Sequence, residues 1–126
     1  MKIRLLTLLA MLVVGGILVT ACGGGAAPTP TARGDAVAGK NKFESTCSAC
    51  HGPDAKGIVG LGKDLTTSEF SKVKTDEELV AFLNKGRDPS DPLSTTGVAM
   101  PPKGGNPALD DDDLFDIVRY VRTLER

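Results

Sequence analysis

The sequence predicts an all-α domain with three main helices and long connecting loops. Three stretches space their apolar residues at intervals of three and four, as one face of a helix requires. Each of these stretches begins at acidic or hydroxyl residues that can cap a helix. No stretch of any length alternates apolar and polar residues as a strand would. With 126 residues, 25% of them charged and 40% hydrophobic, the chain suits one small domain.

The first helix is expected to run from about Asp35 to the sequence CSACH, which begins at Cys47. Asp35 is a suitable N-cap, because its carboxylate can accept hydrogen bonds from the first free backbone amides. Ala36, Gly39, Phe43 and Cys47 then fall on one face. The cluster of cysteines and histidine would therefore end this helix.

The second and third helices have clear start signals. The second is expected to begin at a capping box formed by Thr75 and Glu78 and to end at Gly86. The third follows Asp110–Asp113, four aspartates that suit the positive end of a helix better than they indicate an acidic docking patch. Its apolar stripe consists of Leu114, Ile117, Val118, Val121 and Leu124. Connecting loops of about twenty residues are expected in a compact domain only if they wrap a cofactor.

Residues 1–21 have the features of a secretory signal. Lys2 and Arg4 precede an uncharged run of 15 residues, Leu5–Val19, and small residues lead to Cys22. Because roughly 20 apolar residues are needed to cross a bilayer, an uncleaved transmembrane anchor is the weaker alternative. The sequence VTAC resembles the bacterial lipoprotein signature, which implies that Cys22 is acylated and becomes the first mature residue. A plain signal peptide that leaves an incidental thiol is the other alternative.

Residues 22–34 are expected to comprise the acylated Cys22 and a flexible tether, and residues 35–126 the folded domain. The tether mixes glycine, proline and threonine without apolar periodicity. Together the signal, the lipid and the tether would export the protein and hold the domain at the outer face of the cytoplasmic membrane. The 15 basic and 16 acidic residues give no basic face for nucleic acid.

The cluster from Cys47 to His51 predicts the chemistry of the domain. A structural zinc site usually needs four ligands, and the domain has no further cysteine or histidine. A thioredoxin-like motif expects a βαβ setting, and a simple disulfide between Cys47 and Cys50 leaves His51 unexplained. The spacing C-x-x-C-H is that of c-type haem attachment, in which the two thiols bond one haem and the histidine is the proximal iron ligand.

Met100 is the expected distal iron ligand. The usual donors are His, Met, Cys and Tyr, and Met100 is the only methionine left once Met1 and Met11 are removed with the signal. Pro101 biases Met100 toward an extended backbone, and the prolines of GVAMPPKGG stiffen the loop. The alternative for a lone methionine is core filler.

With these residues, the chain from 35 to 126 resembles a class I, single-haem cytochrome c of the membrane-anchored bacterial kind. The N-terminal helix of that family carries a glycine and an aromatic four residues later, matched by Gly39 and Phe43. Its C-terminal helix carries an aliphatic residue and an aromatic three residues later, matched by Ile117 and Tyr120. In the family these pairs interlock where the helices cross, and a close backbone approach explains Gly39 better than helix propensity does. The resemblance implies the cytochrome c fold, with long loops wrapped around one covalent haem.

Two positions depart from the family pattern. The family usually has a proline whose carbonyl accepts the second N–H of the proximal histidine, and Lys63 stands in that place here. The carbonyl of any residue can make this bond. Many members bind a haem propionate with a tryptophan, which this chain lacks, so Arg87 or Asn84 is a candidate substitute.

The expected function is one-electron carriage and not catalysis. With His51 and Met100 on both axial sites, no position remains for a substrate, and this ligand pair raises the reduction potential. The partners would be membrane-bound donor and acceptor complexes of a respiratory or photosynthetic chain. A gas- or peroxide-binding haem protein with a displaceable Met100 and a permanent cytochrome subunit of a larger complex are the alternatives. Six lysines could surround the haem edge or be ordinary solvated residues: Lys56, Lys63, Lys72, Lys74, Lys85 and Lys103.

Overall fold

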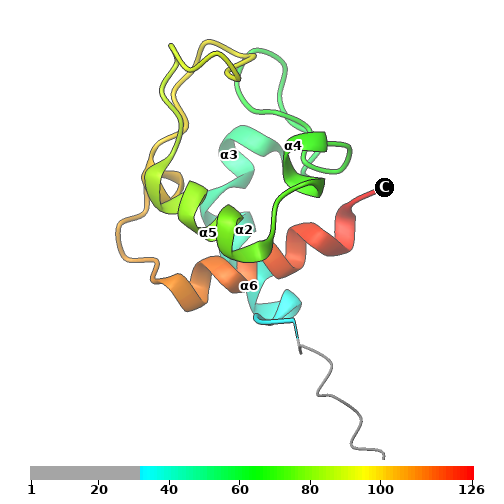
Figure 1. Cartoon of the computed structure of the whole chain (residues 1–126). Coiled ribbons are helices and arrows are strands. Elements are labelled where there is room, and N and C mark those ends of the chain that lie inside the picture. Colours follow the sequence, from blue (N-terminus) through cyan, green and yellow to red (C-terminus); the bar gives the residue numbers. More distant parts are fainter. Residues whose placement is uncertain (1–31) are drawn as a thin grey trace, which may run out of the picture. The chain divides into compact units, whose positions relative to one another are not determined.

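The described part of the chain is helical. The computed structural model describes residues 32–126, in which isolated bridge pairs are the only extended pairing. The main helices, shown in Figure 1, are α2 (Ala36–Thr46), α5 (Asp76–Lys85) and α6 (Asp111–Leu124). The shorter ones are α3 (Ser48–His51), α4 (Glu69–Lys72) and the 3-10 turn η1 (Pro102–Gly105). The predicted all-α class with three main helices is therefore confirmed.

The predicted N-terminal features lie outside the described residues. These are the signal peptide 1–21, the acylated Cys22 and all but the last residues of the tether 22–34. Within residues 32–126, no helix combines the length and the apolar content that crossing a membrane would require.

Helix α2 begins as predicted and ends earlier than predicted. The carboxylate of Asp35 accepts hydrogen bonds from the amides of Val37 (2.7 Å) and Ala38 (3.3 Å). The helix stops at Thr46, Cys47 lies between α2 and the separate turn α3, and α3 carries Cys50 and His51. The hydroxyl of Ser48 donates to the carbonyl of Glu44 at 2.5 Å. Such a side-chain bond competes with the backbone ladder, which accounts for the break between the two helices.

Helices α5 and α6 both start with complete capping boxes. Thr75 Oγ1 accepts from the amide of Glu78 at 3.2 Å, and the amide of Thr75 donates to the Glu78 carboxylate at 2.8 Å. Asp110 and Asp113 make the same pair of bonds at 2.9 and 3.1 Å. Asp110 and Asp113, at the start of α6, therefore have the structural role that the sequence favours, because they satisfy free amides at the positive end of the helix.

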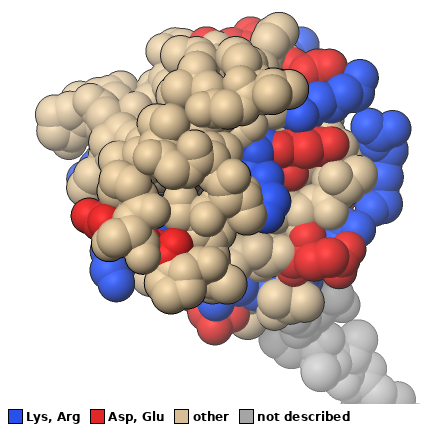
Figure 2. All heavy atoms as spheres, turned by 90° about the horizontal axis from the view of Figure 1, so that it is seen from above, with Lys and Arg blue, Asp and Glu red and all other residues tan. Residues whose placement is uncertain are grey.

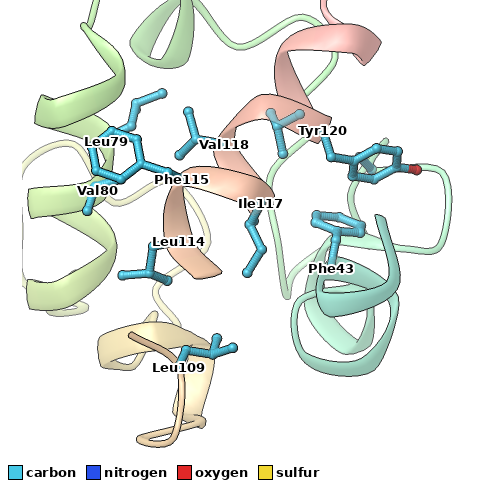
Figure 3. Close-up of a cluster of buried hydrophobic side chains, with 11 residues drawn as sticks. Phe43, Leu79, Val80, Leu109, Leu114, Phe115, Ile117, Val118 and Tyr120 are labelled. Carbon is cyan, nitrogen blue, oxygen red and sulfur yellow. The ribbon is translucent and has the colours of Figure 1, made fainter. Parts of the chain in front are cut away.

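The hydrophobic core is centred on α6 (Figure 3). Residues from α6 pack against Phe43 of α2 and against Leu79 and Val80 of α5. The rings of Phe43 and Tyr120 lie 5.5 Å apart between centroids and are tilted by 59°, a favourable aromatic arrangement. The buried α6 residues are Leu114, Phe115, Ile117, Val118, Tyr120 and Val121.

Helices α2 and α6 cross in direct backbone contact. A Cβ atom on Gly39 would lie 1.9 Å from the carbonyl oxygen of Asp116, so only glycine fits. Beside this contact, Lys42 forms ion pairs with Asp113 (2.7 Å) and Asp116 (2.5 Å). Hydrogen bonds to Asp113 and Asp116 raise the pKa of Lys42, and the bond from Lys42 holds the pKa of Asp113 below its ordinary value. The crossing is thus stabilised by close packing at Gly39 and by the ion pairs of Lys42.

We predict that Gly39→Ala destabilises the haem-loaded protein by about 1–3 kcal/mol, the usual cost of overpacking. The helices must separate to admit the methyl group, which weakens the packing of the whole α6 stripe. Denaturant unfolding monitored by circular dichroism measures the effect, with Asn41→Ala on the exposed side of α2 as the control. Equal stability of the two variants would contradict the close-contact interpretation.

Candidate haem site

The structure brings Met100 to the same hollow as the cysteines and the histidine. The hollow is lined by Cys47, Cys50 and His51 on one side and by Met100 and the residues before it on the other. Its empty space, counted together with the part that is open to solvent, is about 900 Å³. The predicted residues of the domain are therefore close together, while Cys22 lies outside the described residues.

A second hollow leads from the site into the core. Its empty space, counted together with the part that is open to solvent, is about 580 Å³, and it shares Cys47, His51 and Met100 with the first hollow. Its other walls are mainly apolar core side chains, including Phe43 of α2 and Ile117 of α6. The site is thus continuous with the hydrophobic core, and a flat apolar cofactor with polar groups at one edge fits such a space.

The ring of His51 is oriented by Lys63. Nδ1 of the imidazole lies 2.9 Å from the carbonyl oxygen of Lys63. Since a carbonyl can only accept, Nδ1 carries the proton and donates, and Nε2 keeps the lone pair that a metal ligand needs. The replacement of the usual proline by lysine at this position leaves the orienting hydrogen bond in place.

The two cysteines are held near that ring by the turn α3. Both are thiols with no disulfide between them. Burial raises the pKa of the Cys47 thiol to about 11, so the free thiol is protonated at neutral pH. The disulfide alternative therefore receives no support from the structure.

Met100 is fixed through its backbone to the end of α5. Its amide donates to the carbonyl of Arg87 at 2.9 Å, and its carbonyl accepts from the amide of Arg87 at 2.8 Å. Gly86 lies against the same carbonyl, because a Cβ atom there would be 2.3 Å from Met100 O. Gly86 also has φ +72° and ψ −165°, a conformation essentially restricted to glycine. Gly86, the predicted end of the helix, thus also supports Met100, the predicted iron ligand.

Arg87 supplies a buried cation at the wall of the hollow. Its side chain is only 15% exposed, and its guanidinium lies over the rings of Phe70 (4.5 Å) and Phe82 (4.8 Å). Nη1 donates to the carbonyl of Leu93 at 3.2 Å, whereas Nε has no hydrogen-bond partner and is 3.9 Å from Asp91. A buried N–H without an acceptor costs about 1–3 kcal/mol. The site therefore suits a cofactor that brings its own anionic oxygen, as a haem propionate would.

Asn84, the other candidate for this role, is used elsewhere. Its amide donates to the carboxylate of Asp111 at 2.8 Å and so joins α5 to the start of α6. Of the two substitutes suggested by the sequence, Arg87 is the one that lines the hollow.

The sequence does not indicate the aromatic pair that supports Arg87, Phe70 and Phe82. Phe70 lies on α4 and Phe82 on α5, and their rings meet edge to face at 4.9 Å. Helix α4 has four residues, too few for a periodic pattern, so no repeat in the sequence indicates it. Phe82 is visible as an apolar residue of α5, but its pattern gives no reason to place it in the site.

Residues 34–121 match the family described as cytochrome c oxidase, cbb3-type, subunit III. The chain is 30% identical over 92 residues to cytochrome c-554(548) of Halomonas halodenitrificans, which covers 73% of this chain and 99% of that protein. It is 31% identical over 98 residues to cytochrome c-554(547) of Halothiobacillus neapolitanus, again with 73% and 99% coverage. A shorter match, 40% over 53 residues, joins 41% of this chain to 18% of the cbb3-type cytochrome c oxidase subunit FixPc of Rhizobium leguminosarum. No solved structure matches the chain.

The chain belongs to the class I cytochrome c family. The cytochrome carries covalently bound c-type haem and is a haem-based electron carrier, as the family match and the relatives establish. The hollow fits that cofactor: its walls are apolar, its sides offer an imidazole nitrogen and a thioether, and its edge offers a buried arginine.

We predict that Gly86→Ala disturbs Met100 without removing it. The added methyl would lie against the Met100 carbonyl, so the substitution should cost about 1–3 kcal/mol of stability and weaken the iron–thioether bond of the haem-loaded cytochrome. A lower reduction potential and a weaker thioether band in the visible spectrum would report this change.

Gly97→Ala is the matched control for this variant. Gly97 also has a positive φ of +69°, but a Cβ atom there would meet nothing within 4 Å. The control should lose only the stability that backbone strain costs, and its reduction potential and visible spectrum should equal those of wild type. If Gly86→Ala behaves like Gly97→Ala, the contact between Gly86 and Met100 does not support the ligand.

Proposed function

We propose that the cytochrome is a membrane-anchored one-electron carrier with His51 and Met100 as the axial ligands of its haem. The observation that carries this proposal is the meeting of both side chains at one hollow, one from α3 and the other from the loop after α5. Cys47 and Cys50 would hold the cofactor covalently, since they line the same hollow beside His51. The haem supplies the one-electron oxidation and reduction when bound.

The residues of the chain would keep that chemistry to electron transfer. His51, with its proton held on Nδ1 by Lys63, offers Nε2 to the iron. Met100, fixed through Arg87, would fill the opposite side, so that neither side is left for a substrate. Arg87 would compensate the charge of a propionate in the apolar surroundings of its aromatic neighbours. This arrangement has no open position for catalysis, which is why we propose a carrier and not an enzyme.

The anchor would be a lipid on Cys22. The support is the lipoprotein-like sequence VTAC and the glycine- and proline-rich stretch up to residue 34. Where the described chain begins, Arg33 is paired with Asp112 and lies 4.0 Å over the ring of Phe115 on α6. Figure 1 shows this start on the far side of α6 from the loops that form the hollow. A tether attached here would leave the mouth of the hollow accessible.

The partners would be membrane-bound donor and acceptor complexes of an electron-transport chain, reached from the outer face of the cytoplasmic membrane. A permanent place in one larger complex is the second candidate. It is favoured by the family description as an oxidase subunit and by the match to FixPc. The two candidates differ in whether the native protein is extracted from membranes alone or together with other subunits.

We predict different effects for two substitutions of Met100. A thioether favours ferrous iron, so Met100→His should lower the reduction potential substantially, within the ~0.8 V that axial ligands span. Met100→Ala should open the sixth position to small ligands, while the α2–α6 crossing keeps the fold. A redox titration and a carbon monoxide binding assay on wild type and both variants measure these changes. If wild type binds carbon monoxide rapidly and Met100→Ala leaves the potential and the spectrum unchanged, Met100 is not the ligand and the carrier proposal loses its main support.

The lipid anchor makes a separate prediction about the mature N-terminus. Mass spectrometry of the membrane-extracted protein should find a chain that starts at Cys22 and carries acyl groups. Cys22→Ser should lose that modification. An unmodified Cys22, or a chain that retains Met1, would contradict the lipoprotein interpretation and leave the carrier proposal untouched.

A further inference from the structure

Buried polar side chains gather in the segment that leads into α4. Within residues 32–126, three polar side chains are buried, those of Thr66, Ser68 and Ser71, with exposed fractions of 3, 7 and 5%. Ser68 is the N-cap of α4, and Ser71 lies within it. Because a buried polar group is costly unless it is hydrogen bonded, this segment needs polar partners as well as apolar packing.

Arg122 of α6 is the main partner of this segment. Its Nη1 donates to the carbonyl of Ser71 at 3.0 Å, and its Nη2 donates to the carbonyl of Lys74 at 2.6 Å. Its Nε donates to the carboxylate of Asp76, the first residue of α5, at 2.9 Å. The side chain of Arg122 is only 18% exposed. One guanidinium therefore joins α6 to α4, to the residues after it and to the start of α5.

Two residues at the end of α6 add to this connection. The carboxylate of Glu125 accepts from the hydroxyl of Ser71 and pairs with Arg122 at 3.0 Å. The amide of Arg126 donates to the carbonyl of Thr66 at 2.8 Å. Figure 1 places α4 and the C-terminus on the same side of the molecule, and Figure 2 shows positive and negative side chains close together along that side. We call Arg122, Glu125 and Arg126 the C-terminal clamp.

The clamped segment carries Phe70, which reaches the haem site. Phe70 lines both hollows, whereas Arg122 lines neither. The guanidinium of Arg87 lies 4.5 Å from the centre of the Phe70 ring. Arg87 in turn holds Met100 through two backbone hydrogen bonds. Contacts between neighbouring residues thus lead from the clamp through α4 to the expected iron ligand.

We propose that Arg122 is a positioning residue of the haem site, which fixes α4 so that Phe70 supports Arg87 and, through Arg87, Met100. The proposal rests on the proposed role of Met100 as the distal ligand. Arginine suits this task, because its planar fork can donate to two carbonyls and a carboxylate at once, whereas the ammonium of lysine is a single point charge. Without the clamp, Phe70 would support Arg87 less firmly, and Met100 would leave its position more often.

Imidazole binding to the ferric, haem-loaded cytochrome tests the proposal. Imidazole takes the sixth position only when Met100 has left it, so its apparent affinity reports the fraction of molecules in which that position is open. Arg122→Gln should raise the affinity about tenfold and weaken the thioether band of the visible spectrum.

Arg122→Lys should lie between wild type and Arg122→Gln, because it keeps the charge and loses the fork. If Arg122→Gln does not accumulate in the haem-loaded form, Arg122→Lys decides the test by the same two measurements. Variants that bind imidazole as wild type does would show that Arg122 does not position the ligand.

Lys42→Gln is the matched control for a general loss of stability. Lys42 pairs with Asp113 and Asp116 in the first half of α6, so this variant also removes one charge and two ion pairs from that helix. Its denaturant midpoint should fall, while its imidazole affinity and thioether band should equal those of wild type. An equal rise in affinity in Lys42→Gln and Arg122→Gln would overturn the proposal.

A double-mutant cycle determines whether Arg122 acts through Phe70. Phe70→Leu alone should raise the imidazole affinity, and adding Arg122→Gln should change it little further, because the shared contact is already lost. Effects that multiply would overturn the connection through Phe70. Wild type separates this failure from that of the carrier proposal. A wild type without a thioether band would overturn both, whereas a wild type with the band and unaltered Arg122 variants would overturn only the positioning role.

Discussion

The contact of α2 and α6 through Gly39 is the constraint on which the rest of the structure depends. Because the two backbones touch at the carbonyl of Asp116, the side chains beyond the contact interlock. The ring of Phe43 then packs against that of Tyr120, and Ile117 lines the second hollow. The turn α3 follows α2 directly, so the same crossing determines where the two cysteines and His51 stand relative to the core. A shift of α2 along α6 would move the site as a unit.

The opposite wall of the site is built by a different principle. The loop after α5 has no long helix to stiffen it, and Met100 is held instead by two backbone hydrogen bonds to Arg87. Arg87 is in turn packed on Phe70 and Phe82, while its amide and carbonyl hold the methionine. Arg87 therefore has two roles: its backbone positions Met100, the expected distal ligand, and its side chain places a cation at the same hollow. The end of α5 therefore positions both the guanidinium at the hollow and the expected iron ligand Met100.

The sequence predicted local features well and spatial ones only in part. The caps of α2, α5 and α6, the apolar stripe of α6 and the close approach at Gly39 follow from spacing and residue type, and all are present in the structure. The break before α3 was not predicted, because a hydroxyl of Ser48 decides it against the helix pattern. The aromatic support of Arg87 was missed for another reason, since α4 is too short to show a period. The place of the lysines was undecided in sequence, and the structure pairs Lys56, Lys72 and Lys74 with acidic residues two to four positions away along the chain.

The scarcity of large side chains in this chain has a structural explanation in the two hollows. A chain with four phenylalanines, one tyrosine and no tryptophan has few residues that could fill a core between α3, α5 and α6. Phe43 and Leu114 are the largest side chains that are fully buried, and of these two only Phe43 lines the second hollow. The other apolar side chains that line the second hollow include Leu79, Val118 and Val121. Since covalent haem belongs to this family, a haem held by Cys47, Cys50 and His51 would complete the core at these hollows.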